Sequence, residues 1–387
     1  MKYADRLNLL GSETAFELLA KAKKLEAQGH NVVHMEIGEP DFITPKNIID
    51  AGIKALLEGH THYTGSAGDF KNRQLYAEYL NKRYGCKLDG ENVIITPGAK
   101  PVIFLSALAV INPGDEVIYP DPGYPIYRSV VNFLEGVHKP YFLREESGFR
   151  FDPEEVKNLV TPKTKLLILN SPHNPTGGVL TREDLELVID LAMKNDFWIL
   201  SDEIYSRILY GSEHVGVMNF PEAFDRIILL DGHSKTYAMT GWRLGYAVVN
   251  KELAKHFTTL MTNANSCTAA FTQIAGVEAL LGDQSAVEEM VVEFKDRRDL
   301  IVDLMNKLPG VTCHKPDGAF YVFPNFKSYG KKSSELQQMF LEGGVAALAG
   351  TAFGPGGEGY MRFSYATSKD NIREGLSRVA KILADIK

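Results

Sequence analysis

Short apolar segments alternate with helical patterns through the middle of the chain, and this alternation restricts the possible folds most strongly. The apolar segments expected to be buried strands are residues 93–96, 116–119, 165–169, 197–200 and 227–230. Between them, one helix is expected at Pro101–Val110, with proline in its first turn, and another runs from a Thr181 cap to Asn195. Strands that alternate with helices favour an α/β fold whose mainly parallel sheet is covered on both faces.

Polar, aromatic and glycine residues follow the ends of these strands. They are Gly98, Tyr124, Asn174, Asp202, Tyr205 and Lys235. In an open α/β sheet, ligands bind in the crevice outside the carboxyl ends of the strands. We therefore expect these residues to converge on one crevice.

Lys235 lies just beyond the expected strand 227–230. A lysine that emerges from the end of a buried strand is partly desolvated, which lowers the pKa of its amine and makes it a nucleophile for a carbonyl group. A Ser-Lys pair on its own would also fit a surface loop. The other residues of the crevice favour the reactive amine.

The expected strand 93–96 is followed by Gly98, Ala99 and the start of a helix. Free backbone N–H groups and the helix dipole would meet an anion at this point, so the joint resembles a phosphate site. It is neither a Walker A loop nor a GxGxxG dinucleotide fingerprint. Joints of this kind are common in α/β proteins, and the signal is moderate by itself.

Pyridoxal 5′-phosphate would use all of these groups. Lys235 would bind its aldehyde covalently, and Asp202 would pair with the pyridinium nitrogen and keep the ring an electron sink. Asn174 and Tyr205 would hydrogen-bond the ring oxygen, and Tyr124 would stack on the ring. The phosphate would be held by Gly98, Ala99, Ser234 and Arg243.

Several runs of the sequence resemble the class I and II aminotransferases, a fold-type I family of pyridoxal-phosphate enzymes. The runs are YTGSAG (63–68), SPHNPTGG (171–178), SDEIY (201–205), SKTYAMTGWRLGY (234–246) and RFSYA (362–366). The resemblance covers nearly the whole chain, in the same order. It implies an α/β fold with a mainly parallel seven-stranded-type sheet between helices, a smaller α+β domain, and transfer of an amino group between an amino acid and a 2-oxo acid.

The resemblance also implies roles for residues outside the strand ends. Arg362 would bind the α-carboxylate of the substrate, assisted by Gly38 and Asn174, although Gly38 alone also fits an ordinary turn. Tyr63 would reach the phosphate in the neighbouring subunit, which implies a homodimer with shared active sites. The freed Lys235 amine would act as general acid and base at the substrate α-carbon, in two alternating half-reactions.

The resemblance implies two domains. Residues 48–285 would form the large cofactor-binding domain, and residues 1–47 with 286–387 the small domain, joined by an amphipathic helix at 286–308. The small domain would contain a helix at 12–29, strands at 32–37 and 318–323, and a C-terminal helix from Asp370. We expect the glycine-rich run 354–357 to be a solvent loop rather than a ligand loop.

The substrate is suggested by Lys100. In the aspartate aminotransferases of one bacterial subgroup, a lysine at the matching position is associated with the distal carboxylate of dicarboxylic substrates, and Thr14 resembles a second contact. These residues favour aspartate or glutamate, with 2-oxoglutarate as acceptor. Two alternatives stay open: Lys100 could only add charge near the phosphate, and the stretch around Tyr124 also resembles alanine and aromatic aminotransferases.

Other classes share this scaffold. Carbon–sulfur β-lyases and aminocyclopropane-carboxylate synthases keep every cofactor residue, whereas an effector-binding regulator would need a DNA-binding segment, and no basic helix-turn-helix pattern precedes residue 32. The net charge of −7 gives no sign of a nucleic-acid or membrane partner. Three widely spaced cysteines, no metal-ligand spacing and no signal-peptide pattern favour a cytoplasmic protein without a bound metal.

Overall fold

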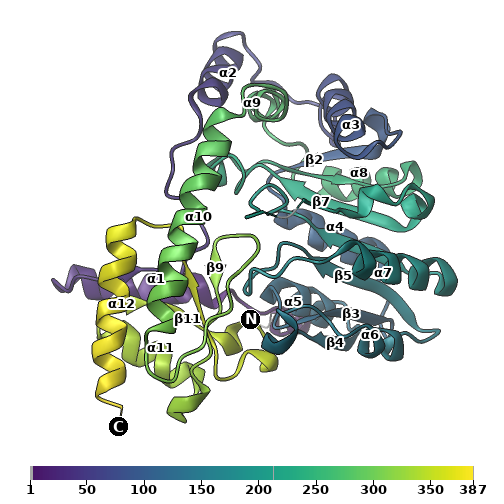
Figure 1. Cartoon of the computed structure of the whole chain (residues 1–387). Coiled ribbons are helices and arrows are strands. Elements are labelled where there is room, and N and C mark those ends of the chain that lie inside the picture. The colour runs from purple at the N-terminus through teal and green to yellow at the C-terminus, as the bar shows by residue number, and fades with distance from the viewer. Residues whose placement is uncertain (1–2, 212, 387) are drawn as a thin grey trace.

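The computed structural model describes residues 3–211 and 213–386. Its largest element is a seven-stranded sheet with the order β2-β8-β7-β6-β5-β3-β4 (Figure 1). The strands are β2 (Val93–Thr96), β3 (Glu116–Asp121), β4 (Val137–Phe142), β5 (Thr164–Asn170), β6 (Trp198–Asp202), β7 (Ile227–Gly232) and β8 (Gly245–Val248). Strand β8 runs antiparallel to both of its neighbours, and the other pairs are parallel. The predicted mainly parallel sheet is confirmed.

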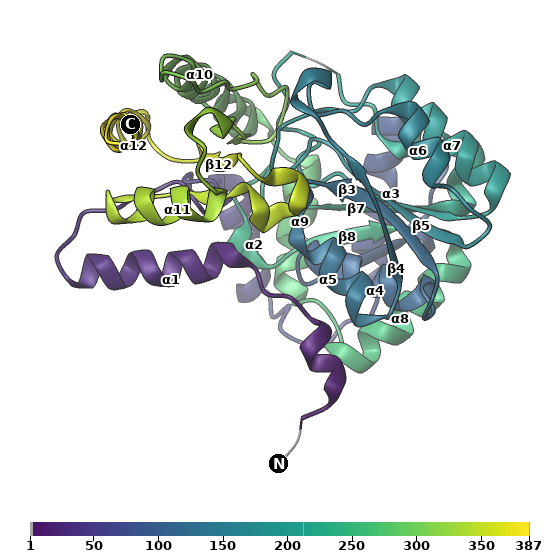
Figure 2. The ribbon, with the colours of Figure 1, turned by 90° about the horizontal axis from the view of Figure 1, so that it is seen from below.

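Helices cover both faces of this sheet (Figure 2). They are α2 (Lys46–Leu57), α3 (Phe70–Tyr84), α4 (Lys100–Val110), α5 (Pro125–Phe133), α6 (Pro153–Leu159), α7 (Arg182–Asn195), α8 (Lys251–Ala264) and α9 (Ala270–Leu281). Helix α7 begins as predicted, because the Thr181 hydroxyl accepts a hydrogen bond from the Asp184 N–H. Helix α3 ends at Gly85, whose φ of 71° is the left-handed conformation that glycine adopts most easily.

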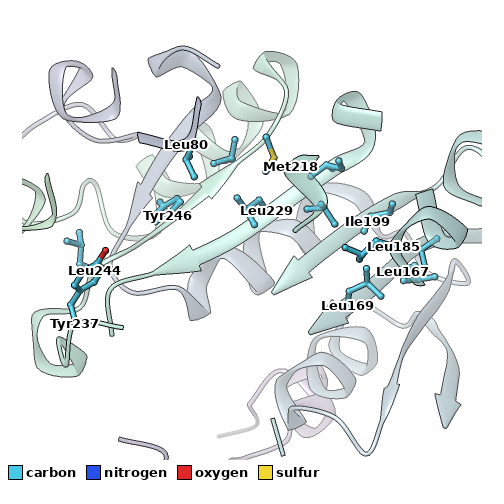
Figure 3. Packing of buried hydrophobic residues seen from close by; sticks show 14 of the residues in the cluster. Leu80, Leu167, Leu169, Leu185, Ile199, Met218, Leu229, Tyr237, Leu244 and Tyr246 are labelled. Carbon is cyan, nitrogen blue, oxygen red and sulfur yellow. The ribbon is translucent and has the colours of Figure 1, made fainter. Parts of the chain in front are cut away.

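Alternate residues of each central strand enter different hydrophobic clusters. In β5, Leu167 and Leu169 lie in one cluster with Leu185 of α7 (Figure 3). Their neighbours Leu166 and Ile168 lie in another cluster, which contains residues of α4, α5 and α8. Because both faces of the strand are buried, the strand sequence is continuously apolar rather than alternating.

A second group of elements lies beside the large sheet, on the left of Figure 1. It contains a three-stranded sheet of β11 (Leu348–Ala349), β12 (Met361–Ser364) and β9 (Tyr321–Val322), and a parallel pair of β1 (Val33–His34) and β10 (Val345–Ala346). Its helices are α1 (Thr14–Ala27), α10 (Ser285–Asn306), α11 (Ser333–Glu342) and α12 (Lys369–Ala384). These elements enclose most of a third cluster, which includes Phe294, Phe320, Phe340 and Phe363.

The remaining elements are short 3-10 turns. They span Asp5–Leu9, Gly90–Asn92, Glu145–Ser147, Val217–Asn219, Pro221–Arg226, Thr240–Trp242, Lys327–Tyr329, Gly350–Phe353 and Pro355–Gly357. Within the described parts of the chain, none of the helices combines the length and apolar character that crossing a bilayer requires.

Two expectations about small elements are wrong. The strands expected at 32–37 and 318–323 are only two residues long each, because only Val33–His34 and Tyr321–Val322 pair with a neighbouring strand. The run 354–357 is not a free solvent loop. Gly356 donates its N–H to Asp121 Oδ1 over 2.8 Å at the end of β3, and a Cβ at Gly354 would collide with the same carboxylate.

Candidate active site

A cavity of about 520 Å³ opens at the carboxyl ends of the central strands. Residues of the seven-stranded and the three-stranded sheets line it. This volume is typical of a site for a small ligand or cofactor. The lining includes the predicted residues Gly38, Ala99, Lys100, Tyr124, Asn174, Asp202, Tyr205, Ser234, Lys235, Arg243 and Arg362. The predicted convergence of the strand ends on one crevice is therefore present in the structure.

Lys235 follows β7 and points across the cavity. Its Nζ donates a hydrogen bond to the Gly38 carbonyl oxygen over 2.5 Å. Burial is the main cause that lowers the pKa of Lys235 to about 8; the nearby Glu39 opposes this shift, and the charges of Arg362 and Arg243 contribute to it. The unprotonated fraction of this amine near neutral pH is therefore far larger than that of an ordinary lysine, and the unprotonated amine is the form that attacks a carbonyl group.

Asp202 is the last residue of β6 and is buried. One carboxylate oxygen accepts a hydrogen bond from Tyr127 Oη over 2.7 Å, and the other accepts one from the Ile204 N–H over 3.3 Å. Burial raises the pKa of Asp202 to about 6. Both donors are neutral, so the site favours a cationic partner from a ligand.

The joint between β2 and α4 forms an open cradle. Gly98 has a φ of 95°, and a Cβ at this position would collide with the guanidinium of Arg243. Arg243 is exposed, and its Nη1 donates to the Thr240 carbonyl oxygen over 2.8 Å. The first N–H groups of α4 have no acceptor within the helix, so the cradle suits an anion such as a phosphate.

Arg362 lies on β12 and is buried in the cavity wall. Its Nη1 donates to Asn174 Oδ1 over 3.0 Å, and its Nη2 donates to the Glu36 carbonyl oxygen. The guanidinium carbon lies 4.5 Å from the ring centre of Tyr321 and 4.8 Å from that of Phe353. These contacts fix the plane of a guanidinium that can bind a carboxylate through two parallel hydrogen bonds.

Tyr205 and Tyr321 form a buried pair whose hydroxyl oxygens are 2.8 Å apart. Burial raises the pKa of Tyr205 well above its usual range, so its hydroxyl keeps its proton and can donate it to a ligand oxygen. A Cβ at Gly38 would overlap the Tyr321 hydroxyl, which gives a steric reason for glycine at that position.

Three predicted residues do not line the cavity. Gly98 is not among the lining residues, and it lies against the guanidinium of Arg243. Tyr63 is 88% exposed on the surface. Thr14 begins α1, and the preceding residue, Glu13, lines the cavity in its place.

Three further residues at the site, Glu13, Tyr127 and Tyr321, were not predicted from the sequence. Tyr127 and Tyr321 lie within largely apolar stretches, where a tyrosine is expected to be an ordinary core residue. The sequence therefore gives no indication that their hydroxyl groups face the site. Glu13 precedes a helix, where an acidic residue normally serves as a cap. Only the proximity of Glu13 to the predicted contact Thr14 could have suggested it.

Comparisons with known proteins show the family. The family model for aminotransferase class I and II matches residues 30–379. The chain is 41% identical to an aspartate aminotransferase from Pyrococcus horikoshii, with 98% of this chain and 97% of that protein covered. A solved structure of aspartate aminotransferase from Thermus thermophilus with maleate has a TM-score of 0.95 at 35% identity, covering 99% of this chain and 100% of that one.

An aromatic aminotransferase from P. horikoshii OT3 is also similar, with a TM-score of 0.91 at 35% identity and 98% of both chains covered. This chain therefore belongs to the class I and II aminotransferases and is a transaminase of fold type I.

Enzymes of this family depend on pyridoxal 5′-phosphate, and the cavity suits this cofactor. It combines an amine with a lowered pKa at Lys235, a buried carboxylate with only neutral donors at Asp202, and a cradle at Gly98 that a side chain would close. These groups match the aldehyde, the pyridinium nitrogen and the phosphate of the cofactor, respectively.

Proposed function

We propose that this transaminase moves the amino group of aspartate or glutamate to a 2-oxo acid such as 2-oxoglutarate. The observation that carries the proposal is that Lys100 and Arg362 line the same cavity as Lys235. A dicarboxylic amino acid has two carboxylates, and Arg362 suits one of them because its guanidinium is held in a fixed plane. Lys100 is a cation for the other.

The cofactor residues have separate roles in this proposal. Lys235 would bind the aldehyde, Asp202 would pair with the pyridinium nitrogen, and Asn174 and Tyr205 would hydrogen-bond the ring oxygen. Tyr124 would stack on the ring. The phosphate is held by Gly98, Ala99, Ser234 and Arg243, which surround the start of α4.

The bound cofactor supplies an electron sink that makes the substrate α-hydrogen acidic. Arg362 and Asn174 orient the α-carboxylate, and this fixes the direction of the bond to that hydrogen. Lys235 Nζ then takes the proton from the α-carbon, because its pKa of about 8 leaves the amine able to accept and return a proton near neutral pH.

A single-turnover absorbance scan tests the substrate. The protein with bound cofactor is mixed with a panel of amino acids without an oxo acid. We expect aspartate and glutamate to convert the cofactor to its amine form. Conversion by alanine or aromatic amino acids alone would contradict the dicarboxylic assignment and favour the alternative suggested by the apolar lining at Phe16, Ile37 and Ile103. Release of ammonia with pyruvate or sulfide would identify a lyase.

We also propose that the protein is a homodimer in which Tyr63 reaches the partner's phosphate. Large apolar side chains are exposed in the chain segment that precedes Tyr63, with Ile43 85% and Leu57 83% exposed. Sedimentation velocity should give twice the chain mass of 43.0 kDa. Leu57→Glu should shift the protein toward monomers. Val137→Glu is the control and should not, because Val137 is a partly exposed residue of the edge strand β4, outside the segment that contains Leu57 and Tyr63. A monomeric parent protein would contradict the proposal.

The domain division into 48–285 and 1–47 plus 286–387 is a further part of the proposal. It is supported by the cluster of buried hydrophobic residues around Phe294 and Phe363, which draws mainly on residues 290–383. Helix α10 would join the two domains. Limited proteolysis should cut first near the ends of α10, and a first cut within the seven-stranded sheet would contradict the division.

We further propose a reducing compartment, the cytoplasm. Cys86, Cys267 and Cys313 are free thiols in the structure. Thiol titration of the denatured protein, purified without a reductant, should detect all of them. Detection of fewer thiols would contradict this assignment.

A further inference from the structure

Glu13 occupies a position in the active site that the proposed reaction does not use. It immediately precedes α1, and its carboxylate points into the cavity rather than toward the first turn of the helix. Glu13 Oε1 accepts a hydrogen bond from Tyr124 Oη over 3.0 Å and one from Lys100 Nζ. The Glu13 side chain is only 16% exposed, compared with 44% for Lys100.

The carboxylate of Glu13 has the same chemistry as the distal carboxylate of a dicarboxylic substrate. It forms an ion pair with Lys100, the cation proposed to bind that group. A substrate carboxylate that approaches Lys100 would therefore meet a negative charge already in place. An uncharged substrate side chain would leave the ion pair intact, and Lys100 would keep its partner.

We propose that Glu13 is a specificity-determining residue that acts as an internal counter-ion for Lys100. It pairs with Lys100 when the substrate side chain is uncharged, and it leaves Lys100 when a dicarboxylic substrate binds. The energy needed to separate Glu13 from Lys100 weakens the binding of dicarboxylic substrates. It therefore reduces the preference of the enzyme for dicarboxylic substrates over substrates with uncharged side chains. This inference rests on the proposed contact between Lys100 and the substrate.

The chain around Glu13 permits this exchange. Residues 10–13 have no regular secondary structure, and the preceding turn, Asp5–Leu9, contains no buried residue. Rotation of the Glu13 side chain alone would release Lys100. Tyr124 keeps its hydroxyl proton, because burial and the neighbouring Glu13 raise its pKa well above the usual range. It can therefore donate to whichever carboxylate is present.

The test is a spectral titration of the protein with bound cofactor. The probes are maleate, which has two carboxylates, and propionate, which has one. Glu13→Gln should lower the dissociation constant of maleate about tenfold, because the competing charge is removed, and should leave that of propionate unchanged. Glu17→Gln is the matched control, since Glu17 lies in the first turn of α1, just after Glu13, and contacts Ser12 rather than the cavity.

Lys100→Met separates this inference from the proposed function. If Lys100 binds the distal carboxylate, Lys100→Met weakens maleate binding, and adding Glu13→Gln to it brings no tenfold gain. If Lys100→Met leaves maleate binding unchanged, the dicarboxylic assignment fails and the role of Glu13 fails with it. If Lys100→Met weakens maleate binding but Glu13→Gln does not strengthen it, or strengthens propionate binding equally, only the Glu13 inference is overturned.

Discussion

The pKa values of Lys235 and Asp202 are shifted toward neutral pH in opposite directions, because both side chains lie in the same buried cavity. Burial disfavours the charged form of each, lowering the pKa of Lys235 to about 8 and raising that of Asp202 to about 6. Between these values most molecules carry the Asp202 carboxylate, and the fraction with a neutral Lys235 amine is far larger than for a lysine of ordinary pKa. A cationic ring nitrogen would stabilise the Asp202 carboxylate and lower its pKa again.

The Lys235 shift predicts the pH dependence of cofactor capture. A lysine with the usual pKa has about 0.3% of its amine unprotonated at pH 8, whereas a pKa of about 8 leaves half of it unprotonated. The rate at which the cofactor-free protein binds pyridoxal 5′-phosphate should therefore rise with pH and level off above about pH 8. A rate that keeps rising to about pH 10 would contradict the shift.

Asp202→Asn should lower kcat/KM about 10²–10³-fold, because an amide cannot balance the charge of a pyridinium nitrogen. Turnover is measured on protein whose absorbance shows bound cofactor. Asp121→Asn is the matched control, since Asp121 is a buried carboxylate at the end of β3 but does not line the cofactor cavity. Equal losses in the two variants would show that Asp202 has no special role.

Among the elements, the joint between β2 and α4 has the strictest steric requirement. Gly98 needs its positive φ of 95° and also the absence of a side chain under Arg243. Gly85 also has a positive φ, 71°, but a Cβ there would meet no atom within 4 Å. Substitutions at these two positions therefore distinguish the effect of backbone strain alone from the effect of losing the phosphate cradle.

Gly98→Ala should weaken binding of pyridoxal 5′-phosphate, since its methyl group displaces Arg243. Gly85→Ala should leave cofactor binding unchanged and cost about 1 kcal/mol in the free energy of unfolding, from backbone strain alone. Cofactor titration and urea denaturation measure the two effects. Unchanged cofactor affinity in Gly98→Ala would contradict the assignment of the cradle.

Elements with strong local signals could be predicted from the sequence. The continuously apolar strands and the Thr181 cap of α7 lie where the sequence placed them. Strands β4 and β8 were missed, because β4 carries His138, Lys139 and Pro140 at the sheet edge and β8 is a short run after a loop. Edge strands and short strands depend on partners distant in the sequence.

The candidate site was predictable where a residue follows a strand end, as Asp202 and Lys235 do. Glu13, Tyr321 and the contact of residues 354–357 with Asp121 were not predictable, since each depends on how the second group of elements packs against the large sheet. Local sequence patterns contain no information about that packing.

At the scale of the whole molecule, residues of the large sheet and of the three-stranded sheet line the same cavity. Asp202 and Lys235 come from the large sheet, whereas Arg362 and Tyr321 come from the three-stranded sheet. A substrate with one carboxylate on Arg362 and the other on Lys100, at the start of α4, would connect the three-stranded sheet with the elements of the large sheet. Binding energy is thereby available to draw them together.

We therefore expect a dicarboxylate to close the molecule. Small-angle X-ray scattering of the protein with bound cofactor should show a smaller radius of gyration with maleate than without it. Arg362→Ala should abolish the change, because the link to the three-stranded sheet is lost. An identical radius with and without saturating maleate would rule out closure.

One cavity should bind both carboxylates of the substrate. A crystal structure of the protein with pyridoxal 5′-phosphate and maleate tests it most directly. We predict that one carboxylate of maleate contacts the Arg362 guanidinium and the other contacts Lys100 Nζ, with Glu13 turned away. A structure with the second carboxylate in solvent and Glu13 still paired with Lys100 would contradict the account.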